Sequence, residues 1–175
     1  NLTLVEPDIE STAQMSIGAI TVENSNIIEN CHVVGGSVVG MGRYIGGIAG
    51  VNNNIIHACS SSTTVTLNFE GTGVKNAGGI TGSNKGIVLA CYATGSITGT
   101  AYLEGAISGE RAGISGEQTA CYWSGDEEKG VGGGLDTTTK VDGEVVTWEN
   151  AMATMNTALD GTGYQWEENP DDKTG

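Results

Sequence analysis

The sequence predicts an all-β fold, a parallel β-solenoid (β-helix) of about four coils of roughly 30 residues, followed by a short C-terminal capping helix. The first observation is a fourteen-residue segment that recurs along the chain. It reads GGIAGVNNNIIHAC at residues 46–59, GGITGSNKGIVLAC at 78–91 and GAITVENSNIIENC at 18–31. The second is that the cysteines ending these copies, together with a fourth at position 121, are separated by 28, 32 and 30 residues. A fixed period of this length is typical of a repeat protein.

The third observation is the composition of each copy, which favours strands over helices. Helical repeats of this length would be rich in Leu, Ala, Glu and Lys, whereas these copies consist mainly of Gly, Asn, Thr, Ser, Val and Ile. After the cysteine the chain alternates between small or apolar residues and polar ones, as in CYATGSIT at residues 91–98. A period of two is that of a β-strand with one buried face. We therefore expect β-branched residues to stack from coil to coil and glycines to form the corners.

The chain divides into four parts on this pattern. The fourth copy of the repeat, residues 105–121, carries about three extra residues before its cysteine. The predicted parts are an N-terminal strand or cover at residues 1–14, the solenoid at 15–123 with coils at about 15–43, 44–73, 74–103 and 104–123, a Gly- and Asp-rich loop region at 124–146, and a C-terminal helix and cap at 147–175.

The helix is predicted to begin after Thr147, which is placed to cap it. Its apolar residues share one face at helical spacing, and they are Trp148, Met152, Met155 and Leu159. Because the last coil of a solenoid leaves a strand edge and the end of its core open, we expect this helix, with Tyr164 and Trp166, to cover that end.

The formal net charge of −14 is unevenly distributed. From residue 104 onward there are fifteen acidic and four basic residues. Nucleic acid is not expected as a partner, because binding to phosphates requires Lys and Arg. Nor does any apolar run approach the roughly 20 residues of a membrane span. The chain opens within a predicted strand, so we expect further domains and an export signal upstream.

The repeat unit GG-I-x-G-x-N-x-x-I-x-x-C, followed by ACYATGSITG at residues 90–99, resembles the GLUG motif repeats of bacterial cell-surface proteins. Such repeats occur in IgA-cleaving streptococcal surface peptidases, outside the catalytic part, and in exported proteins of gut Bacteroides-type bacteria. The ending TWENAMATMNTALDGTGYQWEEN is similar to the segment that closes such arrays. The first copy departs from the family pattern, with Ala19 and Val22 where its sister copies have glycine.

This resemblance implies a non-catalytic module, extracellular or on the cell surface, which could be anchored by lipid through an upstream N-terminus. It implies cell adhesion, with a host or microbial surface glycan or protein as the partner. Two alternatives remain open. The module could be a structural stalk, or it could be a carbohydrate-active β-helix domain, for which we would expect paired carboxylates on one face.

The candidate ligand-binding residues are aromatic, because aromatic rings suit both sugar faces and protein anchors. We expect binding differences in the loops between coils, at residues 41–44, 68–76 and 100–105. The aromatic candidates are Tyr44, Tyr92, Tyr102, Tyr122 and Trp123.

Two sets of aligned residues are predicted to form structural ladders inside the solenoid. The aligned asparagines could bond from coil to coil through their amides. The aligned cysteines could form disulfides, but parallel Cβ vectors favour buried free thiols. Their spacing offers no pairs of zinc ligands. The ladder residues are Asn24, Asn52 and Asn84, with Cys31, Cys59, Cys91 and Cys121.

Other reactive residues form no repeated pattern. His32 and His57 flank cysteines at different offsets, so a nucleophilic triad is not expected. We expect no cofactor, although one acidic group in the 124–146 region could hold Ca²⁺ through its oxygens. That group is Asp126, Glu127, Glu128 and Asp136.

Overall fold

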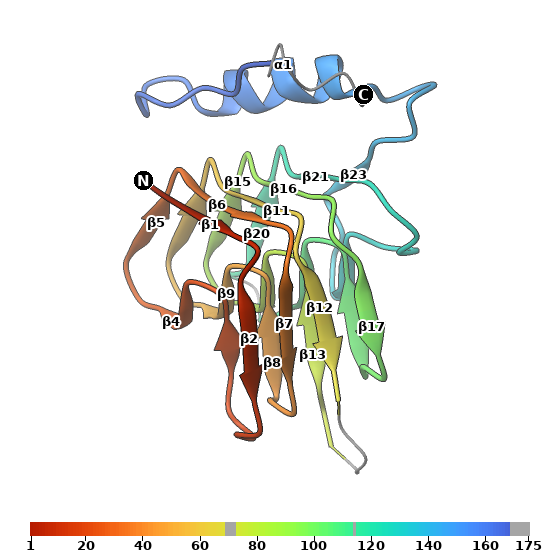
Figure 1. Cartoon of the computed structure of the whole chain (residues 1–175). Coiled ribbons are helices and arrows are strands. Elements are labelled where there is room, and N and C mark those ends of the chain that lie inside the picture. The colour runs from red at the N-terminus through yellow and green to blue at the C-terminus, as the bar shows by residue number, and fades with distance from the viewer. Residues whose placement is uncertain (69–72, 114, 169–175) are drawn as a thin grey trace.

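A computed structural model describes residues 1–68, 73–113 and 115–168. It confirms the predicted fold class, since parallel strands stack as a β-solenoid of about four turns, with one short helix, α1 (Trp148–Ala158) (Figure 1). Part of the predicted binding loop at residues 68–76 lies outside the described residues, as do the last seven positions of the chain.

The strands form five parallel sheets, here called A to E. Sheet A holds β1 (Leu2–Val5), β6 (Cys31–Val34), β11 (Ser60–Ser61), β16 (Tyr92–Ala93), β21 (Tyr122–Trp123) and β23 (Thr139–Lys140). Sheet B holds β2 (Asp8–Ser11), β7 (Ser37–Gly40), β12 (Thr64–Leu67) and β17 (Ile97–Gly99). Sheet C holds β3 (Ile17–Gly18), β8 (Tyr44–Gly46), β13 (Asn76–Gly78) and β18 (Leu103–Gly105). Sheet D holds β4 (Thr21–Asn24), β9 (Ala49–Asn52), β14 (Thr81–Asn84), β19 (Ser108–Arg111) and β22 (Val131–Gly133). Sheet E holds β5 (Ile27–Glu29), β10 (Ile55–His57), β15 (Ile87–Leu89) and β20 (Glu117–Thr119).

The register pairs each residue of the repeat with its counterpart in the next coil. Ile55 pairs with Ile27 on one side and with Ile87 on the other. The core inside the coils is made of the small and branched residues that recur in the sequence, including Ile48, Ile80 and Cys59, which are fully buried. Equivalent side chains therefore stack along the axis, and this burial supplies the main driving force for the fold.

Glycine at the fifth position of the repeat allows sheets C and D to lie directly against each other. A Cβ atom on Gly82 would lie 2.5 Å from the backbone nitrogen of Ile45, and one on Gly109 would lie 2.7 Å from that of Ala77. No side chain fits between these backbones. Val22 holds the equivalent position in the first coil, where the described residues include no earlier strand of sheet C, and its side chain is 51% exposed.

The corner before each cysteine is formed by a residue other than glycine, which differs from the prediction. Asn30, Ala58, Ala90 and Ala120 all have φ between 48° and 51°, in the left-handed region. Each of them except Ala120 has its backbone N–H bonded to the next coil, as from Ala90 to the carbonyl oxygen of Thr119 at 2.9 Å. A left-handed alanine costs about 1–2 kcal/mol, so the bonds and packing of this corner must offset that cost.

The predicted loop region at residues 124–146 is in part regular structure. Strand β22 pairs with β19, and β23 pairs with β21. These short strands extend sheets D and A into an incomplete fifth coil. The repeat pattern had faded there, so the sequence did not indicate them.

Helix α1 covers the side of the solenoid, and the prediction that it covers the open end is wrong. Figure 1 shows the helix lying across the row of coils, beside sheet A. Its buried residues Ala151 and Met155 belong to one apolar cluster with Ala58, Ala90 and Tyr122, which come from successive coils. As predicted, the Thr147 side chain caps the helix, since its hydroxyl oxygen accepts the backbone N–H of Asn150 at 3.3 Å.

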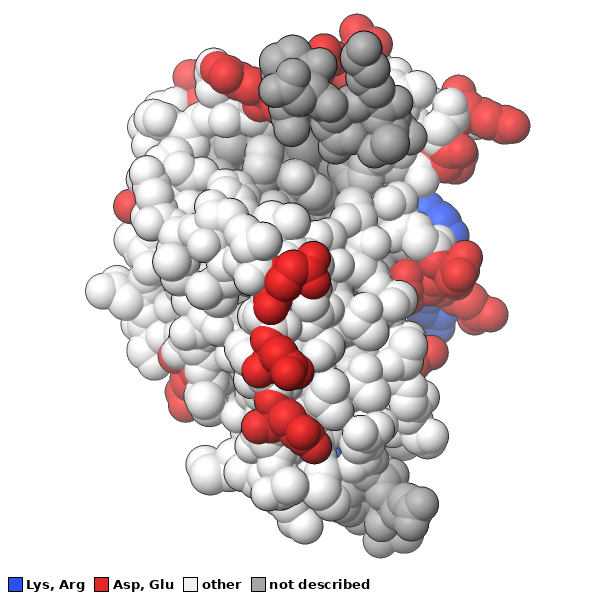
Figure 2. All heavy atoms as spheres, in the orientation of Figure 1, with Lys and Arg blue, Asp and Glu red and all other residues white. Residues whose placement is uncertain are grey.

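Acidic side chains line the outer edge of sheet B. Strand β2 is an edge strand among the described residues, and its Asp8 and Glu10 are exposed. Figure 2 shows three acidic side chains in a row on the face that is turned toward the viewer. Charges on an edge strand discourage pairing with another chain. No helix in the described part of the chain is long and apolar enough to cross a membrane.

Candidate ligand-binding site

The structure does not bring the five aromatic candidates together on one surface. Tyr122 is only 8% exposed and Trp123 only 4% exposed. Trp123 points into the core, with the side-chain nitrogen of Lys140 4.8 Å from its ring centre. The prediction that these two residues form a binding surface is therefore wrong, because alternation along β21 turns one inward while the helix covers the other.

Tyr92 also lies under the C-terminal segment. Its ring centre is 5.4 Å from that of Trp148 and 4.9 Å from that of Trp166, in edge-on geometry. Trp166 is fixed in turn by Asn156, which accepts its backbone N–H at 2.6 Å and donates to its carbonyl oxygen at 2.9 Å. The Tyr92 ring therefore helps to dock the C-terminal segment and is not an open platform.

Tyr44 is half-buried and already has partners. The guanidinium carbon of Arg43 lies 5.1 Å from the centre of its ring. Burial, followed by the negative charge of Glu110, raises the pKa of the Tyr44 hydroxyl. Glu110 also accepts a hydrogen bond from Ser83 at 2.8 Å. These contacts favour a structural role for Tyr44.

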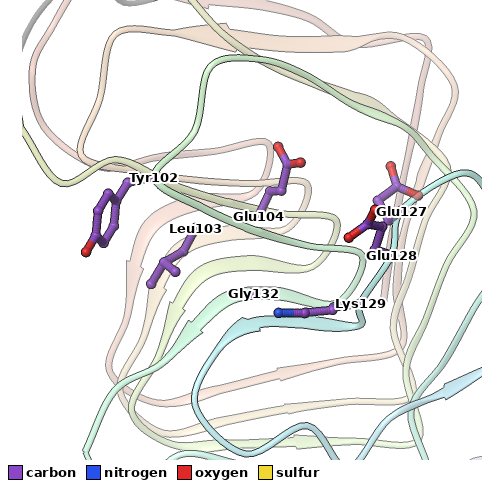
Figure 3. A pocket seen from close by; sticks show the side chains of 7 residues that line it. All are labelled: Tyr102, Leu103, Glu104, Glu127, Glu128, Lys129 and Gly132. Atoms are coloured by element: carbon purple, nitrogen blue, oxygen red, sulfur yellow. The ribbon is translucent and has the colours of Figure 1, made fainter.

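Tyr102 is the aromatic candidate that stays open to solvent, with 70% of its surface exposed. It lies just before β18 and borders a shallow hollow of about 250 Å³. Figure 3 shows Tyr102, Leu103 and Glu104 on one side of the hollow, with Glu127, Glu128 and Lys129 on the other. The two sides belong to segments that are more than 20 residues apart in the sequence, one at the start of β18 and the other just before β22.

The pairing of the last coils brings these two segments together. The backbone N–H of Ala106 bonds to the carbonyl oxygen of Lys129 at 2.9 Å. Gly132 lies against the backbone of Glu104, where a Cβ atom would not fit. Tyr102, Glu127 and Glu128 were among the residues predicted from the sequence, whereas Glu104, Lys129 and the hollow itself were not. The glycines at 130 and 132–134 were the available signal that a backbone passes closely there.

The four acidic residues proposed for Ca²⁺ are not arranged as one site. Asp136 accepts the backbone N–H groups of Gly130 at 3.0 Å and Val131 at 3.1 Å, and so fixes its own loop. Glu127 accepts the backbone N–H of Ile97 at 2.9 Å. In residues 1–68, 73–113 and 115–168, no three His, Cys, Asp or Glu side chains form a group that could hold a metal ion.

The asparagines form a continuous ladder of amides inside the solenoid, as the sequence predicts. Asn24 donates to the side-chain oxygen of Asn52 at 2.8 Å, and Asn52 donates to that of Asn84 at 2.9 Å. Asn84 donates to the carbonyl oxygen of Glu117 at 2.9 Å, where the fourth copy has no asparagine. All three amides are buried and bonded, so they serve the scaffold and not a ligand.

The cysteines are free and buried, which confirms the predicted thiols. Each sulfur lies within hydrogen-bond distance of the carbonyl oxygen two residues earlier, at 3.1 Å from His57 in the case of Cys59. Burial away from water raises the pKa of the Cys121 thiol to about 12. Because the thiolate is the nucleophilic form, this thiol is unreactive in the folded protein.

The histidines lie beside the C-terminal segment. His32 contacts Ser60 Oγ at 2.9 Å through Nδ1 and Asn30 Oδ1 at 3.0 Å through Nε2. This arrangement resembles a nucleophile with its base, but Ser60 is only 7% exposed and the Trp166 ring lies 5.5 Å from His32. Burial lowers the pKa of His32. A substrate could not reach Ser60 while Trp166 is docked.

The fold and the hollow define the class of protein, a β-solenoid repeat protein with a small open site near one end of the rod. No protein-family model matches the chain, and comparisons with curated proteins and with solved structures likewise found no match.

Proposed function

We propose that this chain is a non-catalytic recognition module of an exported or surface-located bacterial protein, and that it binds a host or microbial surface ligand, a glycan or a protein. The observation that carries the proposal is the exposed ring of Tyr102 at the border of the hollow. Aromatic rings supply a large, rigid contact area and are enriched among the residues that anchor partners at interfaces.

The position of Tyr102 supports this proposal. It lies in the segment between coils at residues 100–105, where solenoids place the loops that differ in binding. The coils beneath it are fixed by backbone ladders and by the buried amides, so the site stands on a rigid support. Binding residues on loops that a rigid scaffold positions are a common arrangement.

A structural spacer is the second candidate, and sheet B favours it. The hydroxyl oxygens of Thr66 and Thr98 lie 2.8 Å apart on adjacent strands, and those of Thr64 and Ser96 lie 3.5 Å apart. Hydroxyl groups that bond one another along the axis make a polar face on β12 and β17, with the acidic Asp8 and Glu10 on the edge strand β2. Such a face suits a rod that holds other domains apart.

An array of mucin glycans, microbial polysaccharides and matrix proteins tests the two functions. We expect saturable binding that Tyr102→Ala abolishes and Tyr102→Phe largely retains, because the ring makes the contact. Val145→Ala serves as the control, since Val145 is exposed at a distant loop. If binding is absent across the array, or is unchanged by Tyr102→Ala, the recognition function is wrong and the spacer remains.

A further inference from the structure

We propose that the hollow beside Tyr102 binds a lysine side chain of a protein partner. This inference rests on the proposed recognition function and names the chemistry of the ligand. It is drawn from the charge, the aromatic ring and the apolar lining of the same hollow.

The charge of the hollow is negative. Glu104, Glu127 and Glu128 line it against the single ammonium group of Lys129. Glu104 and Glu128 are exposed, so they are free to turn toward a ligand. The whole chain carries −14, and Figure 2 shows Asp and Glu predominating over Lys and Arg on the face in view. Such a field attracts basic partners and repels sialylated, sulfated or phosphorylated ones.

The ring of Tyr102 provides a face for a cation. An ammonium group within about 6 Å of an aromatic ring centre is attracted by the negative charge on the face of the ring. The protein already places cations over rings in this way, Arg43 over Tyr44 at 5.1 Å and Lys140 over Trp123 at 4.8 Å.

The lining favours a lysine over a metal ion. One oxygen of Glu127 is held by the backbone of Ile97, and the described carboxylates form no metal-binding group. Tyr102, Leu103 and Gly132 add apolar surface to the hollow. A lysine combines an apolar four-carbon stem with a charged end, and so matches both parts of this lining.

Matched peptides test this inference on the whole chain. A lysine-rich peptide and the same peptide with every lysine acetylated differ only in the ammonium groups. We expect the free peptide to bind at least about tenfold more tightly, which corresponds to about 1.4 kcal/mol. Binding should weaken as salt is raised from 50 to about 300 mM, since salt screens exposed charges.

Variants give effects of opposite sign. Tyr102→Ala and Glu104→Gln should each weaken peptide binding by roughly three- to tenfold, because each removes one attractive contact. Lys129→Gln should strengthen binding, since it removes the one repelling charge of the hollow. Glu149→Gln on α1 is the control, because it removes one negative charge as Glu104→Gln does. It should have no effect on peptide binding, since Glu149 is exposed and does not line the hollow.

The outcomes separate this inference from the proposed function. If the acetylated peptide binds equally well, or if Lys129→Gln weakens binding, the lysine assignment is wrong. Binding to a chitosan oligosaccharide, an amine-bearing glycan, without binding to the peptide would also overturn it. Tyr102-dependent binding to a neutral glycan on the array would then leave the recognition function standing.

Discussion

The indole Nε1–H of Trp166 donates a hydrogen bond to the backbone carbonyl oxygen of Ala90, at 2.9 Å and across 76 residues of sequence. Ala90 is the left-handed corner residue before Cys91. The bond therefore ties the C-terminal segment to the most regular feature of the solenoid, and it shows how the segment is held on the side of the rod.

Trp166→Ala should lower the free energy of unfolding by about 3 kcal/mol, because it removes a large half-buried ring and its hydrogen bond. Trp166→Phe keeps most of the ring and should cost less, about 1 kcal/mol. Urea unfolding followed by circular dichroism measures both. An Ala variant as stable as the parent would show that the segment is only loosely docked.

Asn52→Asp should destabilise the protein by about 2–4 kcal/mol. The change removes an amide donor and places a carboxylate beside the side-chain oxygen of Asn84, in the middle of a fully buried ladder. Thermal melting at neutral pH provides the measurement. The same change at the exposed Asn54 is the control and should be nearly neutral. Equal melting temperatures for the two variants would count against a stabilising amide ladder.

Stability should fall as the pH rises above 9. The folded pKa of Cys121 is about 12, above its ordinary value of 9.0. Between pH 9 and the folded pKa, the unfolded chain has lost the thiol proton and the folded chain has not. Each pH unit in this range therefore lowers the free energy of unfolding by about 1.4 kcal/mol. Unfolding free energies measured from pH 8 to 10.5 should show this slope. Cys121→Ala should have a flatter profile, and an identical profile would contradict the assignment.

The thiols should be unreactive until the protein unfolds. All four are buried and free, so a thiol reagent at pH 8 should label none of Cys59, Cys91 and Cys121 in the native protein and all four cysteines in urea. Cys31 lies in the first complete coil and is slightly more exposed than the other three cysteines, so it should be the first thiol to react as the urea concentration is raised. Fewer than four thiols in urea would indicate a disulfide.

Gly82→Ala should destabilise the protein by more than about 3 kcal/mol, because its Cβ would press on the backbone of Tyr44 and Ile45, which cannot move aside. Val22→Ala changes the matching position of the first coil and should be tolerated, since Val22 faces solvent. Urea unfolding compares the two. Similar losses for both would mean that sheets C and D are not packed backbone to backbone.

The periodic part of the sequence was enough to predict the coils. Ile, Asn and Cys recur at fixed positions, and stacking in parallel register places each on its counterpart, as the bonds from Asn24 through Asn52 to Asn84 show. Prediction was weaker where the repeat fades. Strands β22 and β23 were missed, because short strands that complete sheets begun elsewhere need no pattern of their own.

The candidate site could be predicted only in part. Composition identified Tyr102 as one of five aromatic candidates. The alternation of side chains along β21 turns Trp123 into the core, and the C-terminal segment with its helix covers Tyr92 and Tyr122. The sequence shows that α1 has an apolar face but not which surface that face will meet. The nearby glycines indicated only that a backbone passes closely, and did not indicate that Glu104 and Lys129 would meet, since their proximity depends on how the last coil closes.

The sequence by itself determined the solenoid, its inward-facing residues and its buried ladders, because a repeat in parallel register obeys the same local rules in every coil. Only the tertiary structure decided where the C-terminal segment docks and which aromatic ring stays open. The physical reason is that both depend on contacts between segments far apart in the chain, Trp166 with Ala90 and Lys129 with Ala106, and no periodicity encodes such contacts.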